Sequence, residues 1–363
     1  MNKFQSVRYK LMPQMKEYDK LANIWKPFVM FFNQPNFKSQ VYNLDKFGLR
    51  FNDLSNLKNL DIEKNNSIFN EKIFSNCKET AALVGASTAF GTGASSDAFT
   101  ISNILSKKTN THFFNVSCSA FSGFQEIILF QSFINFLKNI KKVVLLSGLN
   151  DLFLINYIST FDPVFGPHYF SHRYVKGMIR DTLSWKRKLA KVIFEPFIEH
   201  EVYWNSVTKN ELLNIFFKKN KIKNQNLPDK EEMLKNMLKK NFQFWSNIQK
   251  AMGIKILYFL QPSASWCEKD LSDEEKEIFS VTDVTSNGPY QISKLLDNKV
   301  YKNYKNIIVE NCNHYNIDFF DCNEYISNNN FNKQWFFIDR WHLTDLGNKN
   351  VSDFIISKLL SIF

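Results

Sequence analysis

Short apolar runs alternate with segments of helical periodicity from residue 81 onward, and this alternation restricts the possible folds most strongly. Each run is nearly continuous in apolar residues, as expected for a strand that is covered on both faces of a sheet. Strands separated by helices predict a parallel sheet with right-handed crossover connections, and therefore the α/β class. The predicted strands are residues 81–85, 112–116, 143–147, 255–260 and 317–321.

The segments between and after these runs carry apolar residues at helical spacing. Asp229, followed three residues later by Glu232, resembles a capping pair and predicts a helix that runs from there towards Met252. Two further helices are indicated by apolar residues at Phe124, Ile127, Ile128, Phe130, Ile134 and Leu137, and at Val351, Phe354, Ile355, Leu359 and Ile362.

The chain of 363 residues suits a single α/β domain with a large insertion as well as it suits two domains. Residues 1–79 are expected to form an irregular or helical N-terminal extension that packs on the core, and residues 80–363 to form the α/β domain. Residues 165–228 interrupt the alternation with an aromatic and basic segment, which predicts a helical insertion. It could act as a lid that selects the substrate, or it could be a helical decoration that only packs.

The formal net charge of +11 raises the question of a nucleic-acid or anionic partner. Lysines are scattered along the chain, however, and the tightest run, residues 218–223, is typical of a solvated helix end or loop. We therefore expect no nucleic-acid partner. Binding through the basic insertion stays open as an alternative, and it would show steeply salt-dependent affinity.

Cysteines and histidines give no sign of a disulfide framework, a metal or a cofactor. The five cysteines are odd in number and form no C-x-x-C pair, which favours a reducing, cytoplasmic location. His168 and His172 have a spacing that suits a metal, but no acidic or cysteine ligand is near them in sequence, so surface histidines are favoured. No apolar stretch approaches the roughly 20 residues of a membrane span, and we expect no transmembrane segment.

Four residues that follow predicted strands or lie in late loops carry the chemistry of acyl transfer. Ser87 comes at a strand-to-loop turn, and Asp339 and His342 lie three residues apart near the C-terminus. An imidazole can take the proton of a serine hydroxyl while a carboxylate holds the imidazole in the required tautomer. The Asn150 amide and the N–H of Ser87 could donate hydrogen bonds to a developing oxyanion.

Each of these residues also has an ordinary structural explanation. Gly85-Ala86-Ser87 could be a small-residue turn, Asn150 a residue of a strand-end turn, and His342 an exposed side chain beside a helix capped by Thr344 or Asp345. The order of the partners along the chain favours a catalytic triad. In an open parallel sheet, loops at the carboxyl ends of the strands bring such groups together.

The same segments resemble, in order, the four conserved blocks of the SGNH (GDSL-like) hydrolases. The resemblance covers residues 80–363 with a gap over the insertion, and it extends to residues 41–50, which are similar to a lead-in of bacterial relatives linked to surface-sugar acylation. The four matching segments are Gly85-Ala86-Ser87, Asn115-Val116-Ser117-Cys118-Ser119-Ala120-Phe121, Gly148-Leu149-Asn150-Asp151 and Asp339-Arg340-Trp341-His342-Leu343-Thr344.

This resemblance implies a flavodoxin-like, three-layer α/β/α fold with a parallel five-stranded sheet. It implies that Ser87 is the nucleophile, His342 the base and later the acid, and Asp339 the partner that orients His342. It further implies an oxyanion hole formed by the N–H groups of Ser87 and Ala120 and by the Asn150 amide.

Two positions depart from the pattern of that family. Ala86 stands where the first block usually has aspartate, and Ala120 stands where the second block usually has glycine. Alanine can present its backbone N–H as glycine does, unless the backbone there needs a positive φ. Asp151 is left out of the catalytic set.

The sequence thus predicts a serine-dependent acyl-ester hydrolase, an O-acyl or O-acetyl esterase acting on a carbohydrate through an acyl-enzyme. Its expected partner is a small-molecule or glycan acyl ester, which could serve as an acyl donor, and no cofactor is expected. Two alternatives remain open: an O-acetyltransferase that modifies a surface-glycan sugar, and a non-catalytic carbohydrate-binding protein on the same fold. The oligomeric state is not predicted.

Overall fold

A computed structural model describes residues 3–26, 28–53, 66–74, 77, 79–155, 229–285 and 296–362. The chain divides into two compact units, one made of Met1–Tyr169 and Met233–Phe363 and the other of Phe170–Glu232. Of the second unit, the structure describes only residues 229–232. The expected insertion over residues 165–228 lies outside the described residues.

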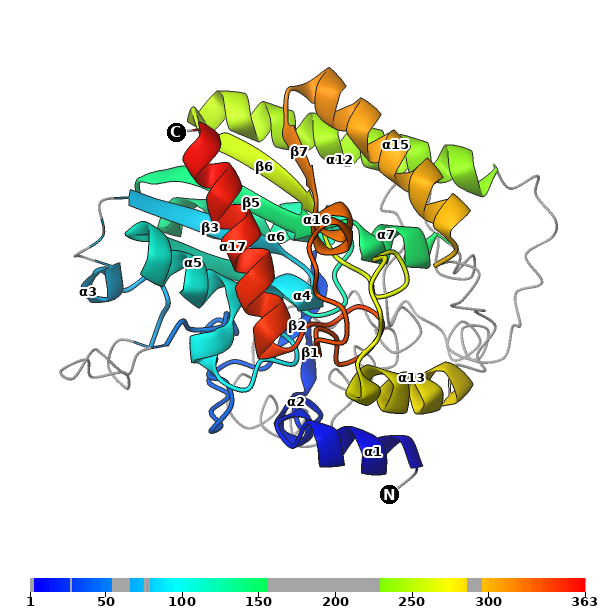
Figure 1. Cartoon of the computed structure of the whole chain (residues 1–363). Helices are drawn as coiled ribbons and strands as arrows, with labels where there is room; N and C mark the ends of the chain where they lie inside the picture. The colour runs from blue at the N-terminus through cyan, green and yellow to red at the C-terminus, as the bar shows by residue number, and fades with distance from the viewer. Residues whose placement is uncertain are drawn as a thin grey trace, which may run out of the picture. The chain divides into compact units, whose positions relative to one another are not determined.

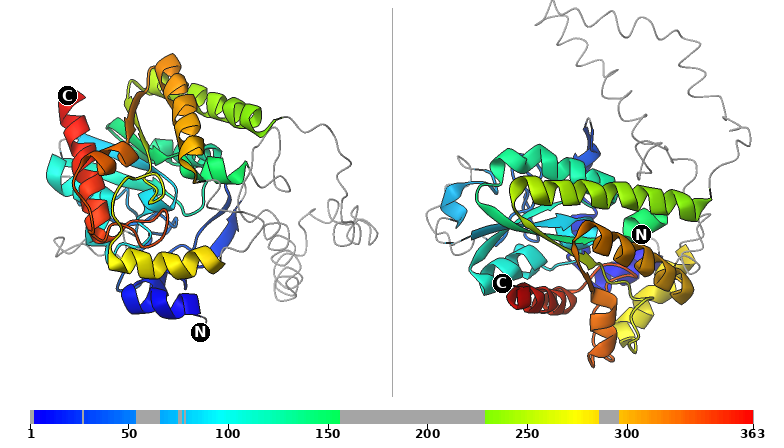
Figure 2. Two further views of the ribbon diagram at one scale, coloured as in Figure 1. Left: turned by 45° about the vertical axis from the view of Figure 1, so that its right-hand side comes forward. Right: turned by 90° about the horizontal axis from the view of Figure 1, so that it is seen from above.

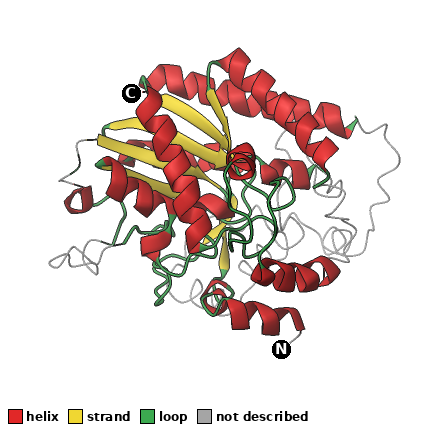
Figure 3. Cartoon of the chain, viewed as in Figure 1, coloured by secondary structure: helices red, strands yellow, loops and turns green. Residues whose placement is uncertain are grey.

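The first unit contains a five-stranded sheet whose strands all run parallel, in the order β4-β3-β5-β6-β7 (Figures 1 and 3). Counted along the sheet-forming part of the chain, this is the order 2-1-3-4-5 of flavodoxin-like folds. The predicted α/β class and five-stranded parallel sheet are confirmed, and each predicted run became a strand. The strands are β3 (Glu79–Gly85), β4 (Thr111–Ser117), β5 (Ile140–Ser147), β6 (Lys255–Leu260) and β7 (Asp318–Asp321).

The register of the three strands at one side of the sheet sets where the site can form. Gly85 at the end of β3 pairs with Ser117 on β4 and with Leu146 on β5, so these three strands end at the same level. Nearly every residue of β3 and β4 is buried, because both faces of the sheet are covered. The loops that follow Gly85, Ser117 and Ser147 therefore meet at one edge of the sheet.

Helices α5 (Ile101–Thr109), α16 (Cys322–Asn328) and α17 (Asp345–Ile362) cover one face of the sheet. Leu105 of α5 and Ile355 of α17 belong to one buried cluster with Leu83 and Leu146 of the strands. Figure 2 shows α5 and α17 together on this side of the strands.

Helices α6 (Gly123–Phe133) and α12 (Lys230–Met252) cover the opposite face (Figure 2). Phe130 of α6 packs edge-on against Trp245 of α12, with ring centroids 5.3 Å apart, and Phe242 of α12 contacts Tyr258 of β6. Helix α15 (Asn298–Tyr315) runs beside α12 in Figure 1 and contacts β7. Short 3-10 turns at Asp97–Phe99 and Ile134–Phe136 complete the connections of α5 and α6.

The N-terminal residues form more regular structure than expected. They contain α1 (Lys3–Leu11), α2 (Met15–Tyr18), an antiparallel hairpin of β1 (Asn23–Lys26) and β2 (Met30–Asn33), and α3 (Glu71–Phe74). The hairpin was not predicted, because its turn lacks an Asn-Gly or Asp-Gly pair. Phe28 and Met30 instead supply the positive φ angles, 66° and 71°. Helix α1 packs against α13 (Asp273–Thr285).

Three properties bear on the expectations about membranes, disulfides and metals. Among the helices that the structure describes, none has the length and apolar character that crossing a membrane requires. All five cysteines fall in described segments and none is joined to another; Cys77 is half-buried and the other four are buried. Within the described ranges, histidine, cysteine and acidic side chains form no group that could hold a metal ion.

Candidate active site

Ser87 lies at the first position of the short helix α4 (Ser87–Phe90), directly after β3. The turn needs a glycine at position 85, because a Cβ there would come within 2.2 Å of the Leu146 carbonyl oxygen and 2.7 Å of the Ala89 Cβ. At the end of the helix, Gly91 adopts φ = 85°, the left-handed conformation that closes α4. The Ser87 N–H has no partner within the helix at this position, so it can face a substrate oxygen.

The loop that carries the imidazole is closed on itself by local hydrogen bonds. Phe337 and Leu343 form an antiparallel bridge, and the Ile338 N–H donates to the His342 carbonyl over 3.0 Å. One oxygen of Asp339, Oδ1, accepts from the N–H groups of Trp341 and His342 at 3.0 and 2.8 Å. These bonds leave the second oxygen of the carboxylate free to face the imidazole.

The structure brings Ser87, His342 and Asp339 together across 255 residues of sequence. Ser87 Oγ lies 2.7 Å from His342 Nε2, and His342 Nδ1 lies 2.7 Å from Asp339 Oδ2. A carboxylate can only accept, so the Nδ1 atom carries the ring proton. The Nε2 atom of a neutral imidazole then accepts from the serine hydroxyl, which is the arrangement that activates a serine nucleophile.

The electrostatics of Asp339 suit an orienting role. Burial raises the pKa of its carboxyl, but the His342 imidazole, as a charge and as a donor, together with the N–H groups of Trp341 and His342, outweighs burial and lowers the pKa below its usual range. Asp339 is therefore ionised at neutral pH, and a charged carboxylate in this position could stabilise a positive charge on the imidazole.

Contacts with neighbouring elements fix the His342 loop against the sheet. The Thr88 hydroxyl on α4 donates to the Trp341 carbonyl over 3.1 Å, which ties α4 to this loop. The Arg340 guanidinium pairs with Asp283 of α13 at 2.6 Å and lies 4.2 Å above the Phe279 ring centroid. Thr344 also caps α17, as the structural alternative proposed, because its hydroxyl accepts from the Gly347 N–H. The cap and the Ser87 contact therefore coexist.

Ala120 lies in the loop after β4, three residues beyond Ser117, and its backbone has φ = 63°. This is the left-handed conformation, the condition under which an alanine was not expected to replace a glycine freely. A residue with a Cβ loses on the order of 1 kcal/mol there relative to glycine. The backbone N–H is still available for donation, so the substitution strains the loop without removing the donor.

Asn150 lies in the first turn of α7 (Leu149–Leu154), directly after β5 and Gly148. Its Nδ2 atom donates to the Phe121 carbonyl over 2.7 Å, so Asn150 and the residue next to Ala120 are joined. The amide has a second N–H that this bond does not use. Asn150 and Ala120 thus lie together on the sheet edge where Ser87 begins α4.

Two residues that hold elements of the site in place, Arg50 and Asp151, were not predicted to have a role there. Arg50 donates through Nη1 to the carbonyls of Phe90 and Gly91, at the end of α4. Asp151 accepts from the Gly123 N–H over 2.9 Å, at the start of α6. The S-x-x-Q spacing of Ser122 and Gln125, which form a capping box, marks the start of α6 and could have directed attention to this contact.

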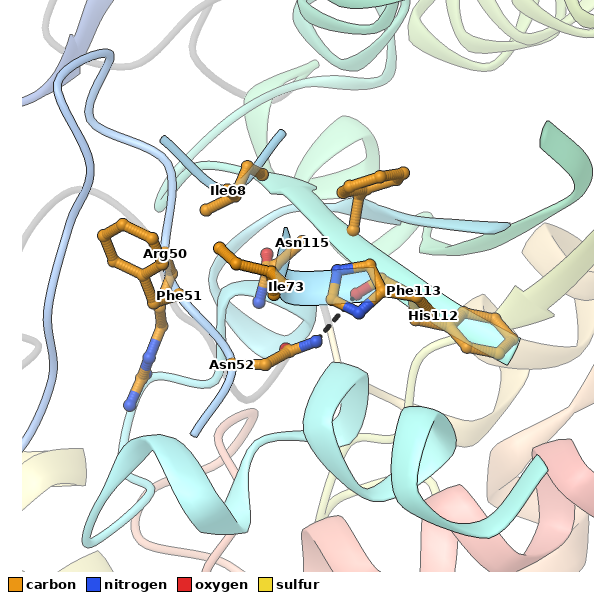
Figure 4. Close-up of a pocket in the computed structure, with 9 residues that line it drawn as sticks. Arg50, Phe51, Asn52, Ile68, Ile73, His112, Phe113 and Asn115 are labelled. Atoms are coloured by element: carbon orange, nitrogen blue, oxygen red, sulfur yellow. Dashed lines mark hydrogen bonds between the residues drawn. The ribbon is translucent and has the colours of Figure 1, made fainter. Parts of the chain in front are cut away.

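A small pocket lies elsewhere, and neither Ser87, Asp339 nor His342 lines it. It is bounded by Arg50, Phe51, Asn52, Ile68, Ile73 and residues 112–115, and its volume of about 10 Å³ is close to what one water molecule needs (Figure 4). Burial lowers the pKa of His112, one of its walls, to about 4, so this imidazole is neutral at pH 7. The pocket is too small for an ester substrate.

Two expectations fall on residues that the structure does not describe. The His168 and His172 pair and the basic run over 218–223 both lie in the range 156–228, outside the described residues. The alternatives attached to them, a metal pair and an anion site, stay hypotheses.

Comparisons with known proteins match no family model and no curated protein. Among solved structures, the chain is similar to an acetyl xylan esterase, with 13% identity over 77% of this chain and 98% of that one and a TM-score of 0.39. An extracellular lipase from Streptomyces rimosus has 10% identity over 77% and 99%, also with a TM-score of 0.39. A lipase/acylhydrolase from Enterococcus faecalis has 8% identity over 77% and 95%, with a TM-score of 0.38.

The three-layer fold of this chain follows from its own strand order and helix placement.

Proposed function

We propose that this protein is a serine-dependent acyl-ester hydrolase, an O-acyl or O-acetyl esterase that acts on a carbohydrate ester. The single observation that carries the proposal is the chain of two 2.7 Å contacts from Ser87 Oγ through His342 to Asp339. This partly buried series of contacts is the arrangement that nucleophilic catalysis by serine requires. The carbohydrate part rests on the resemblance over residues 41–50.

The proposed reaction has two halves. Ser87 Oγ attacks the carbonyl carbon of the ester while its proton passes to His342 Nε2, and the carbonyl oxygen becomes an oxyanion. The N–H groups of Ser87 and Ala120 and the Asn150 amide donate to this oxygen. The carbon–oxygen bond to the alcohol then breaks, and the alcohol leaves with the proton from His342, which leaves an acyl group on Ser87.

In the second half, water attacks the acyl-enzyme and gives its proton to His342. The tetrahedral intermediate collapses, and the serine oxygen recovers its proton as the carboxylic acid leaves. A sugar hydroxyl in place of water would give transfer through the same intermediate, so the two outcomes differ in how well the site excludes water. Asp339 orients His342 throughout and stabilises it while it is charged.

A direct test compares the wild type with Ser87→Ala in hydrolysis of short-chain aryl acetates and of an acetylated xylo-oligosaccharide. We expect turnover and labelling by a fluorophosphonate in the wild type and neither in the variant. Ser95→Ala is the matched control, because Ser95 is an exposed serine later in the same connection, bonded to Asp345. Equal turnover in wild type and Ser87→Ala would refute the proposal, and labelling without turnover of sugar esters would refute the substrate class.

A further inference from the structure

Two adjacent residues of α7 hold the loop that carries Ala120. Asn150 donates through Nδ2 to the Phe121 carbonyl over 2.7 Å, and Asp151 accepts through Oδ1 from the Gly123 N–H over 2.9 Å. Asn150 is the donor in the first bond and Asp151 is the acceptor in the second. The two bonds hold the segment 118–123 at Phe121 and at Gly123. The loop after β4 is therefore attached at two places to the turn after β5.

Asp151 occupies an environment that is costly for a carboxylate. Its side chain is buried, and a second buried acid, Glu126 of α6, accepts the Ser147 hydroxyl through both oxygens at 2.8 and 2.7 Å. Burial raises the pKa of Asp151 to about 6, and burial together with the charge of Asp151 raises that of Glu126 to about 8. A buried acid with no polar partner would cost several kcal/mol, so the bond to the Gly123 N–H is the contact that offsets its burial.

The contact is possible because position 123 is a glycine, which has no side chain to block the carboxylate. A Cβ on Gly123 would lie 2.7 Å from Asp151 Oδ2 and 2.9 Å from Asn241 Nδ2. Gly123 is the first residue of α6, directly after the cap Ser122, where the penalty for glycine in a helix interior does not apply. The absence of a side chain lets the carboxylate reach the first N–H of α6, where an acidic group is favoured by the helix dipole.

The strain at Ala120 explains why the loop needs such anchors. Its φ of 63° is unfavourable for alanine by on the order of 1 kcal/mol, so a loop without anchors would relax towards a more common backbone conformation. Such a change would rotate the Ala120 N–H away from its present direction. The bonds from Asn150 and to Asp151 lie on the C-terminal side of Ala120 and oppose this change.

We propose that Asp151 is a positioning residue of the oxyanion hole, which holds the Ala120 N–H in place by accepting the Gly123 N–H. This inference rests on the proposed esterase function, in which Ala120 donates to the oxyanion. Asp151 itself contacts neither Ser87 nor the reacting atoms; it acts through the loop 118–123.

The test compares Asp151→Ala, Asp151→Leu and Asp151→Asn with the wild type. Both Asp151→Ala and Asp151→Leu remove the acceptor of the Gly123 N–H. The leucine side chain also fills the space of the carboxylate, so that this variant is expected to fold without the hydrogen bond. Asparagine keeps an oxygen that can accept from Gly123. We expect kcat on an aryl acetate to fall about tenfold or more in the first two variants, a part of the about 10² to 10³ that a complete oxyanion donor supplies. Asparagine should restore most of it.

KM should change little in all three variants, because the oxyanion forms only in the transition state. Asn241→Ala is the matched control: Asn241 is buried beside the same glycine, and its Nδ2 has no hydrogen-bond partner among the described residues. It should leave kcat unchanged. A folded Asp151→Leu with the kcat of the wild type, or Asp151→Asn as slow as Asp151→Leu, would overturn the proposal.

Amide hydrogen exchange separates this proposal from the function on which it rests. The amides of Ala120 and Gly123 should exchange faster in Asp151→Leu than in the wild type and in Asp151→Asn, whether or not the protein hydrolyses esters. Faster exchange in Asp151→Leu than in the wild type, together with a wild type that lacks ester turnover, would refute the esterase function and keep the anchoring contact. Unchanged exchange in a protein with turnover would refute the role of Asp151 alone.

Discussion

Arg50 and Asp97 form an ion pair, Nε to Oδ1 at 2.8 Å, that is buried behind the helix carrying Ser87. The Arg50 side chain has no exposed surface, and it also donates to the carbonyls of Phe90 and Gly91 at the end of α4. Asp97 in turn accepts from the side chain of Asn43. The segment around residue 50 thus supports α4, the helix that begins at Ser87.

Removal of Arg50 should therefore destabilise the protein strongly. We expect Arg50→Met to lower the free energy of unfolding by about 3 to 5 kcal/mol, because it leaves the Asp97 carboxylate buried without its cation. Urea unfolding followed by circular dichroism measures the change. Lys138→Met, which breaks the exposed pair of Lys138 with Glu71, is the control and should leave the midpoint unchanged. Equal midpoints for wild type and Arg50→Met would contradict the structural role of the pair.

The buried acid Glu126 should make stability fall as pH rises. Its pKa is raised to about 8 in the folded protein, so between its ordinary value of 4.5 and about 8 the folded protein keeps a proton that the unfolded chain has lost. Stability is then lost as pH rises through this window. Relative to Glu126→Gln, the wild type should lose on the order of a few kcal/mol between pH 5 and 9. Parallel stability curves for the two proteins in urea unfolding would show that Glu126 does not titrate in this way.

Loss of the Asn150 amide should slow turnover. We expect Asn150→Ala to reduce kcat by about 10² to 10³ with a much smaller change in KM, since the amide would donate to an oxyanion that is present only in the transition state. Initial rates on an aryl acetate over a range of concentrations give both constants. A proportional rise in KM with kcat unchanged would assign Asn150 to substrate binding instead.

Glycine at position 120 should stabilise the protein. Ala120→Gly removes the clash of a Cβ in the left-handed conformation, although it also makes the unfolded chain more flexible. We expect a net gain below about 1 kcal/mol in the free energy of unfolding, with kcat kept or raised because the N–H donor remains. A loss of stability similar to that of a glycine placed inside a helix would indicate that Ala120 is not strained.

The central strands of the sheet could be predicted because they are nearly continuous apolar runs, which follows from burial on both faces; the edge strand β7, Asp-Phe-Phe-Asp, is only partly buried and has a less continuous run. The β1–β2 hairpin could not be predicted. It has positive φ angles at Phe28 in the turn and at Met30 at the start of β2, and neither side chain favours such an angle. The positive φ of Ala120 could not be predicted either, and the segment that follows it is bonded to Asn150 and Asp151 on a different element of the fold.

The same distinction applies to the candidate site: an arrangement within one loop could be predicted from the sequence, and contacts between distant segments could not. Asp339 and His342 lie three residues apart, so a shared loop could be expected from spacing alone. The support of α4 by Arg50 and of the loop 118–123 by Asp151 depends on contacts between distant segments. A buried arginine or aspartate has no sequence pattern of its own, and only the fold reveals its partner.

The most direct test of the central claim is the mass of the intact protein after brief incubation with an activated acetyl ester and acid quenching. The account predicts a species heavier by one acetyl group, mapped by peptide fragmentation to Ser87, which water clears with time and which Ser87→Ala never forms. Clearance that requires an added glycan would identify a transferase with the same nucleophile. An adduct on another residue, or ester turnover that continues in Ser87→Ala, would contradict the account.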